Sequence, residues 1–159
     1  MNKITTTWDK HTDRRIKTLH PLLRQDVVLF INLVEVQFGI FLRVTQAERT
    51  IGEQNDFYAI GRTTPGNIVT NARGGQSFHN YGLAFDIVEI KNKKASWKID
   101  WDRIIPKAKK LGFEWGGDFR SFKDKPHFQK TFGLSIAECK YLYKYRSGHY
   151  ITIPVEVEG

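Results

Sequence analysis

Apolar residues recur at helical spacing in the first quarter of the chain. The set that shares this period is Leu22, Leu23, Val27, Phe30, Ile31, Val34 and Phe38, and Gly39 follows it directly. Residues three and four positions apart fall on one face of a helix. The pattern therefore predicts a helix over 21–38 that ends at the glycine. A shorter helix is expected just before it, over 12–18.

Strand patterns occupy the middle of the chain. Residues 84–90, AFDIVEI, give the strongest of them, and 40–45, IFLRVT, a second. Shorter strands are expected over 113–115 and 126–129. Further helices are predicted over 49–60, 100–111 and 135–145, the last opened by a capping box of Ser135 and Glu138. Helices at both ends and short strands between them indicate an α+β fold with a small antiparallel sheet flanked by helices.

The segment 62–82 is a long loop with glycines at 66, 74 and 75. Loops of this length inside small domains are usually functional or mobile. The total of 159 residues fits one compact domain over 1–159. The only cysteine, Cys139, excludes an intrachain disulfide and a cysteine-rich zinc module, and we expect it to be a small buried hydrophobe on a helix.

The net charge of +8 favours a polyanionic partner. That partner could be nucleic acid, an anionic membrane or the anionic polymers of a cell wall. No helix-turn-helix, RNA-binding or zinc-finger pattern is present, so we expect no nucleic acid. No stretch approaches the ~20 apolar residues that a membrane span needs. Residues 1–15 lack the apolar segment of a signal peptide, so we expect synthesis in the cytoplasm without one.

Asp86 is an acidic residue on an otherwise apolar face of the predicted strand. Alternation along 84–90 places it on one face with Ala84, Val88 and Ile90. A buried carboxylate without a partner is costly, so an arginine, a lysine or a metal ion must meet it.

Two histidines are candidates to join Asp86. His79 precedes it by seven residues in a loop, and Gly82 would let the backbone turn so that the two converge. His127 lies on the short strand PHFQ. Two histidines and an aspartate with an open fourth position are typical of a catalytic zinc site. Taken singly, His79 could be an ordinary loop histidine and His127 a satisfied core histidine. The other histidines, His11, His20 and His149, are expected at the surface.

The segment 77–86, SFHNYGLAFD, matches the S-x-H-x-x-G-x-A-x-D signature of the zinc D-Ala-D-Ala metallopeptidases, and DKPH at 124–127 matches the second half of that signature. From about 46 to 129 the chain resembles the L-alanyl-D-glutamate peptidase branch, which includes phage endolysins and bacterial wall hydrolases. The segments that carry this resemblance are QAERT at 46–50, EQ at 53–54, GRT at 61–63, PG at 65–66, and WGGDF at 115–119.

The resemblance implies the compact fold shared with the hedgehog signalling domain. It also implies one zinc ion per chain, with His79, Asp86 and His127 as its ligands. Carboxypeptidase relatives usually carry glutamate in the second motif and tryptophan just before the last histidine. This chain has Asp124 and Pro126 there, which favours the endopeptidase branch.

Amide hydrolysis needs a group that takes a proton from water and passes it to the leaving amine. Asp124 is the expected group, and Glu114 is the rival. The substrate of the family carries the free carboxylate of D-Glu, which suits an arginine fork. Arg49 aligns with the family's substrate-contacting arginine, although Ala47 stands where the family usually has glycine. Gln54 and Ser77 are the polar candidates beside Arg49. Arg62 would either contact substrate or hold the long loop together.

These observations predict a monomeric zinc peptidase that cuts the L-Ala–D-Glu bond of peptidoglycan stem peptides. A phage or prophage endolysin is expected, acting at the cell wall or periplasm after holin-type release. Two alternatives remain open from the sequence. One is a D-Ala-D-Ala carboxypeptidase, and the other is a non-catalytic, zinc-containing module that binds the wall.

Overall fold

Strand β2 (Ala84–Lys91) lies at the centre of the fold, which the computed structural model describes for residues 4–154. It pairs antiparallel with β1 (Leu42–Gln46), β3 (Lys94–Ser96) and β5 (His127–Gln129), and β5 pairs with β4 (Glu114–Trp115). Around this sheet the described residues form the α-helices α1 (Lys10–Ile16), α2 (Pro21–Phe38), α3 (Ile51–Ala59), α4 (Trp101–Lys110) and α5 (Ile136–Lys144). The predicted α+β fold is confirmed.

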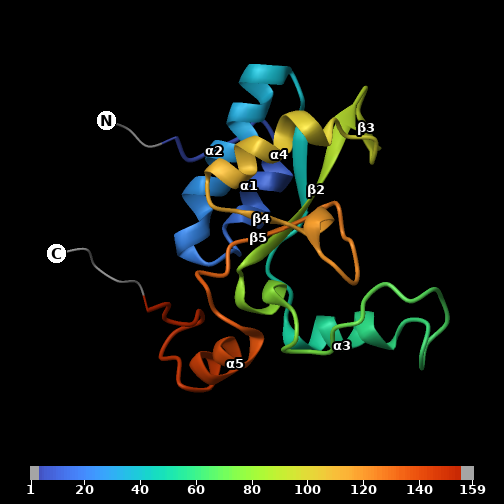
Figure 1. Cartoon of the computed structure of the whole chain (residues 1–159), viewed down its shortest axis with the longest axis vertical. Coiled ribbons are helices and arrows are strands. Elements are labelled where there is room, and N and C mark those ends of the chain that lie inside the picture. The colour runs from blue at the N-terminus through green and yellow to red at the C-terminus, as the bar shows by residue number, and fades with distance from the viewer. Residues whose placement is uncertain (1–3, 155–159) are drawn as a thin grey trace.

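Helices α1, α2 and α4 lie together on one side of the sheet, whereas α3 and α5 lie toward the opposite end of the molecule (Figure 1). The short 3-10 helix η1 (Phe78–Tyr81) joins this opposite end to β2, and a second one, η2 (Gly116–Asp118), lies in the connection between β4 and β5. Residues from η1, β2 and β5 therefore meet where the sheet faces α3 and its loop.

An aromatic cluster fills the core between the sheet and the helices. Phe30 of α2 lies 5.4 Å, centroid to centroid, from Phe128, and Phe85 stacks on Phe128 at 5.5 Å. Phe113 closes the cluster against Phe85 at 5.2 Å. All four side chains are buried, and burial of one such ring contributes about 1.5–3 kcal/mol. The odd positions of β2 thus face the core, which leaves Asp86 on the other face.

Most predicted elements appear within one or two residues of their expected bounds. The capping box of Ser135 and Glu138 opens α5 as predicted. Cys139 is fully buried on α5, also as predicted, and its burial raises the pKa of the thiol to about 11. The expectation that His20 lies at the surface was wrong, because its side chain is buried. Leu22 shares the apolar period of α2 but is 46% exposed.

His20 is buried because it joins two distant parts of the chain. Its Nδ1 accepts from the backbone N–H of Leu22 at 3.2 Å, which caps α2, and its Nε2 donates to the carbonyl of Ile151 at 2.8 Å. The hydroxyl of Tyr150 donates to the carbonyl of Thr18 at 2.8 Å. The irregular segment after α5 is therefore fastened to the turn between α1 and α2.

Strand β3 was not predicted. It forms a hairpin with β2 through Asn92 and Lys93, whose φ values are 50° and 65°. Two residues with positive φ are the geometry of a tight hairpin turn, which usually carries Asn-Gly. Lys93 stands where such turns usually carry glycine, so the Asn-Gly pattern that predicts a hairpin is absent from the sequence. Across residues 4–154, no helix combines the length and the hydropathy required to cross a bilayer.

Candidate metal centre

The structure brings His79, Asp86 and His127 together, with one ligand atom of each within 4.8 Å of the others. Oδ1 of Asp86 lies 3.3 Å from Nε2 of His79 and 3.3 Å from Nδ1 of His127. Asp86 and His127 are direct partners in the register of β2 and β5, which places their side chains on the same face of the sheet.

His79 reaches the cluster because η1 is fixed at both ends. The Ser77 hydroxyl accepts from the backbone N–H of His79 at 3.2 Å and opens η1. Gly82 closes it with a φ of 70°. A Cβ on Gly82 would lie 2.6 Å from the backbone nitrogen of His20, so only glycine fits this turn. The predicted role of this glycine in the turn is confirmed.

The backbone also orients the His79 ring. Its Nδ1 lies 2.8 Å from the carbonyl oxygen of Ala47. A carbonyl only accepts hydrogen bonds, so Nδ1 carries a proton, and in the neutral ring Nε2 presents its lone pair toward Asp86. The 3-10 helix is held against the same segment by the backbone N–H of Arg49, which donates to the carbonyl of His79 at 3.0 Å.

The donor set fits a divalent metal ion. Oδ1 of Asp86 is buried and receives no hydrogen bond from the described residues, although burial demands a compensating partner. Ligand atoms of a tetrahedral zinc ion lie about 3.3 Å apart for bonds of 2.0–2.1 Å, which matches the two separations from Oδ1. Burial would raise the pKa of Asp86, but interactions with His79 and His127 in their protonated forms lower it overall. A divalent cation would supply the same positive charge between neutral rings.

Asp124 lies beside this cluster on the loop between η2 and β5. Its backbone N–H donates to the carbonyl of Gly116 at 2.9 Å, and its carbonyl accepts from the N–H of His127 at 3.1 Å. Burial and the Asp86 carboxylate raise the pKa of Asp124. The side chain lines the same cleft as His127.

Glu114 occupies a different position from the one that a catalytic base requires. Its Oε2 accepts from Nε2 of Gln129 at 2.9 Å. It lines a separate hollow with Lys109 and Asp118 and does not line the cleft that Asp124 and His127 share. Gln129 thus lies between Glu114 and His127, and Asp124 is the better placed of the two candidate bases.

The cleft beside the cluster has a volume of about 700 Å³. Its walls come from α3 and the loop that follows it and from the loop that carries Asp124. Sequence reasoning missed the lining residues Tyr58, Val69, Thr70, Asn71, Arg73, Gln76, Phe119 and Phe122. Apart from Phe119, which ends the WGGDF segment, none of them lies in a motif, and only the length of the loop over 62–82 indicated that this region is functional.

Arg49 is held by two neighbours near the cluster. Its Nη1 donates to Oε1 of Gln54 at 2.9 Å, and its guanidinium lies 4.6 Å from the centroid of the Phe57 ring. Its Nε is buried and has no partner in residues 4–154. Burial lowers the pKa of Arg49, while the carboxylates of Asp86 and Asp124 oppose that shift.

The other two predicted substrate contacts differ in their settings. Gln54 is fully buried, and its Nε2 donates to the carbonyl of Ala72 at 2.8 Å, so its amide positions Arg49 and the loop and is not open to a ligand. The Ser77 hydroxyl caps η1, and its contact with substrate stays a prediction. Arg62 donates hydrogen bonds to the carbonyls of Tyr58 and Thr70 and so links α3 to the long loop. This agrees with the expectation that Arg62 holds the loop together.

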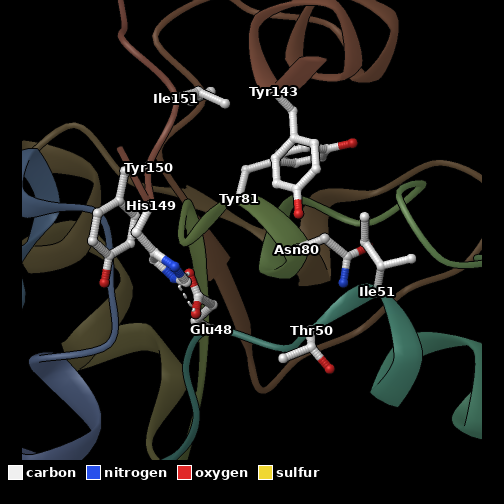
Figure 2. Close-up of a pocket in the computed structure, with 9 residues that line it drawn as sticks. All are labelled: Glu48, Thr50, Ile51, Asn80, Tyr81, Tyr143, His149, Tyr150 and Ile151. Atoms are coloured by element: carbon white, nitrogen blue, oxygen red, sulfur yellow. Dashed lines mark hydrogen bonds and ion pairs between the residues drawn. The ribbon is translucent and has the colours of Figure 1, made fainter. Parts of the chain in front are cut away.

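A smaller hollow of about 70 Å³ is lined by residues that follow Ala47 and by the segment after α5 (Figure 2). His149 and Glu48 point toward each other there, with Nε2 of His149 2.8 Å from Oε1 of Glu48. His149 is exposed, as predicted. This ion pair ties the segment after α5 to the chain that supports His79.

The chain is similar to known wall peptidases. The sequence profile of a family described as D-alanyl-D-alanine carboxypeptidase matches residues 70–130. The chain is 42% identical over 122 residues to the peptidoglycan L-alanyl-D-glutamate endopeptidase CwlK of Bacillus subtilis, a match that covers 70% of this chain and 72% of that protein. It is 43% identical over 58 residues to an L-alanyl-D-glutamate peptidase of a Listeria phage, covering 34% of this chain and 21% of the phage protein.

A solved structure shares the fold. The crystal structure of the L-Ala D-Glu endopeptidase ChiX of Serratia marcescens superimposes with a TM-score of 0.56 at 26% identity, over 80% of this chain and 92% of that one. The predicted resemblance to the endopeptidase branch is confirmed by these similarities.

Proposed function

Because the chain belongs to the family of peptidoglycan L-alanyl-D-glutamate endopeptidases, we propose that it hydrolyses the L-Ala–D-Glu bond of stem peptides at the site formed by His79, Asp86, His127 and Asp124. The observation that carries this proposal is the convergence of two imidazole nitrogens on an unpartnered carboxylate oxygen beside an open cleft. The ligand set supports zinc as the resident ion, one per chain.

Zinc bound there would lower the pKa of a water molecule toward ~7 and polarise the scissile carbonyl. Asp124 accepts the proton of the attacking water and delivers it to the leaving amine. The backbone bonds of Asp124 to Gly116 and His127 hold it at a fixed place relative to the ligands.

The substrate presents an α-carboxylate-bearing D-Glu next to the scissile bond. Arg49 is the residue proposed to bind that carboxylate, because its guanidinium is held by Gln54 and Phe57 and its Nε is without a partner among the described residues. Ser77 is proposed as a second polar contact. The similarity to a phage enzyme supports action at the cell wall. Release by a membrane-permeabilising partner is part of the proposal.

Digestion of purified muropeptides tests the bond that is cut. We expect products with a new N-terminal D-Glu, identified by mass spectrometry after labelling of free amines. Release of free D-Ala as the only product would assign the protein to the carboxypeptidases. Intact muropeptides after incubation with zinc-loaded protein would support the non-catalytic wall-binding module.

The Gly116→Ala variant should lose about 10²-fold in kcat, since misplacing a reacting group by ~1 Å costs that much. A Cβ on Gly116 would lie 2.1 Å from the carbonyl oxygen of Asp124 and 3.0 Å from Cβ of His127, so the loop with the base must move outward. Steady-state kinetics on a soluble stem peptide measures the effect. Gly148→Ala is the matched control because a Cβ there meets no atom within 4 Å. Equal kcat for both variants would contradict the proposed position of Asp124.

A further inference from the structure

Gln129 connects a metal-ligand candidate to a carboxylate outside the cleft. It follows His127 by two residues on β5, so both side chains lie on the same face of the strand. Oε1 of Gln129 lies 2.7 Å from Nε2 of His127. Nε2 of Gln129 donates to Oε2 of Glu114, its partner in the register of β4 and β5, at 2.9 Å. His127 and Gln129 are both buried.

The direction of every hydrogen bond in this row follows from Glu114. A carboxylate only accepts, so the amide nitrogen of Gln129 must face Glu114. The amide oxygen of Gln129 then faces His127 and requires a proton on Nε2 of that ring. In the neutral ring that a metal ion requires, Nδ1 of His127 is left with its lone pair, and Nδ1 is the atom 3.3 Å from Asp86.

The two candidate ligand histidines are thus oriented by different means. For His79 a backbone carbonyl, that of Ala47, selects the tautomer directly, and no side-chain substitution can reverse a carbonyl. For His127 the side-chain amide of Gln129 selects the tautomer. This amide could be rotated to present either its oxygen or its nitrogen, and its hydrogen bond to the exposed Glu114 fixes which of the two faces His127.

We propose that Glu114, acting through Gln129, fixes the tautomer and orientation of His127 so that Nδ1 is presented to the metal ion. The inference rests on the proposed metal centre. Glu114 and Gln129 are positioning residues, and neither contacts the substrate or the reacting atoms. Hydrogen-bond partners of metal ligands typically change metal affinity by 10–100-fold when they are replaced.

The Glu114→Lys variant tests the proposal, because lysine only donates and would turn the amide oxygen of Gln129 toward itself. Gln129 would then present its NH₂ group to His127, which places the proton on Nδ1 and blocks metal binding. We expect the Kd for Zn²⁺ to rise about 10–100-fold, measured by competition with a chromophoric chelator. Ring ¹⁵N chemical shifts of His127 in the metal-free protein, recorded at a pH where the ring is neutral, should change from the Nε2-protonated to the Nδ1-protonated pattern.

The matched control is Asp118→Lys. Asp118 is also exposed and lines the same hollow as Glu114, so this variant makes the same change of charge without touching Gln129. It should retain the wild-type Kd and ring shifts. The double variant Glu114→Lys with Gln129→Glu restores a carboxylate between the introduced lysine and His127. This carboxylate accepts from both, so the double variant should recover most of the lost affinity.

Equal Zn²⁺ affinities for Glu114→Lys and Asp118→Lys, with His127 still protonated at Nε2, would overturn the role of Glu114 and leave the proposed function intact. A wild-type protein that binds no Zn²⁺ would overturn both. Failure of the double variant to recover affinity would show that Glu114→Lys acts through a path other than Gln129.

Discussion

The Asp124→Asn variant should keep one zinc ion per chain and lose peptide hydrolysis by about 10²–10⁴-fold, the usual contribution of general base catalysis. Asparagine preserves the shape of the side chain but cannot accept the proton of the attacking water. The three metal-ligand candidates are untouched, so elemental analysis should find the wild-type metal content. Rates on a soluble stem peptide, measured at equal zinc occupancy, give the effect.

Glu114→Gln is the comparison for this experiment. An amide at 114 can still accept from Gln129 through its oxygen but no longer forces that orientation, so at equal zinc occupancy the variant should lose far less activity than Asp124→Asn. A reversed result, with Asp124→Asn active and Glu114→Gln inactive, would show that the assignment of the base is wrong.

The His127→Ala variant should lose the metal ion and the activity together. Removal of one imidazole leaves His79 and Asp86 as a two-ligand site, and catalytic zinc sites use three protein ligands. Elemental analysis of protein prepared without chelators should give one zinc per wild-type chain and only background metal in the variant. Hydrolysis should fall to the level of the buffer blank.

His11→Ala is the control for loss of a histidine, because His11 is exposed and its ring contacts only Arg14 among the described side-chain hydrogen bonds. It should retain metal and activity. Stoichiometric zinc in His127→Ala, or no zinc in the wild-type protein, would contradict the proposed ligand set.

Elements and motifs that depend on residues close together in the sequence could be predicted. The apolar period of α2, the capping box of α5 and the strand over 84–90 are local patterns, and the structure has elements at all three places. The candidate site was also accessible, because His79 and Asp86 lie within one short motif and Asp124 and His127 within another.

Features that depend on contacts between distant segments could not be predicted in this way. His20 is buried because its ring donates a hydrogen bond to the carbonyl of Ile151, 131 residues away along the chain. Gln54 is not available to a ligand because its amide oxygen accepts a hydrogen bond from Arg49 and its amide nitrogen donates one to the carbonyl of Ala72. Glu114 was considered as a base from its position in the chain, and only the pairing of β4 with β5 shows that Gln129 separates it from His127.

The fastening of the segment after α5 matters for anyone who builds chimeric enzymes from this chain. Helix α5 ends at Lys144, which would look like a natural junction for a fused wall-targeting module. The residues that follow, 145–154, bury Ile151 and Ile153 in the core and supply the carbonyl that holds His20. A fusion point at the end of α5 would remove these contacts and expose the hydrophobic core beside the α1–α2 turn. A fusion point after residue 154 would retain the buried isoleucines and the hydrogen bond to His20.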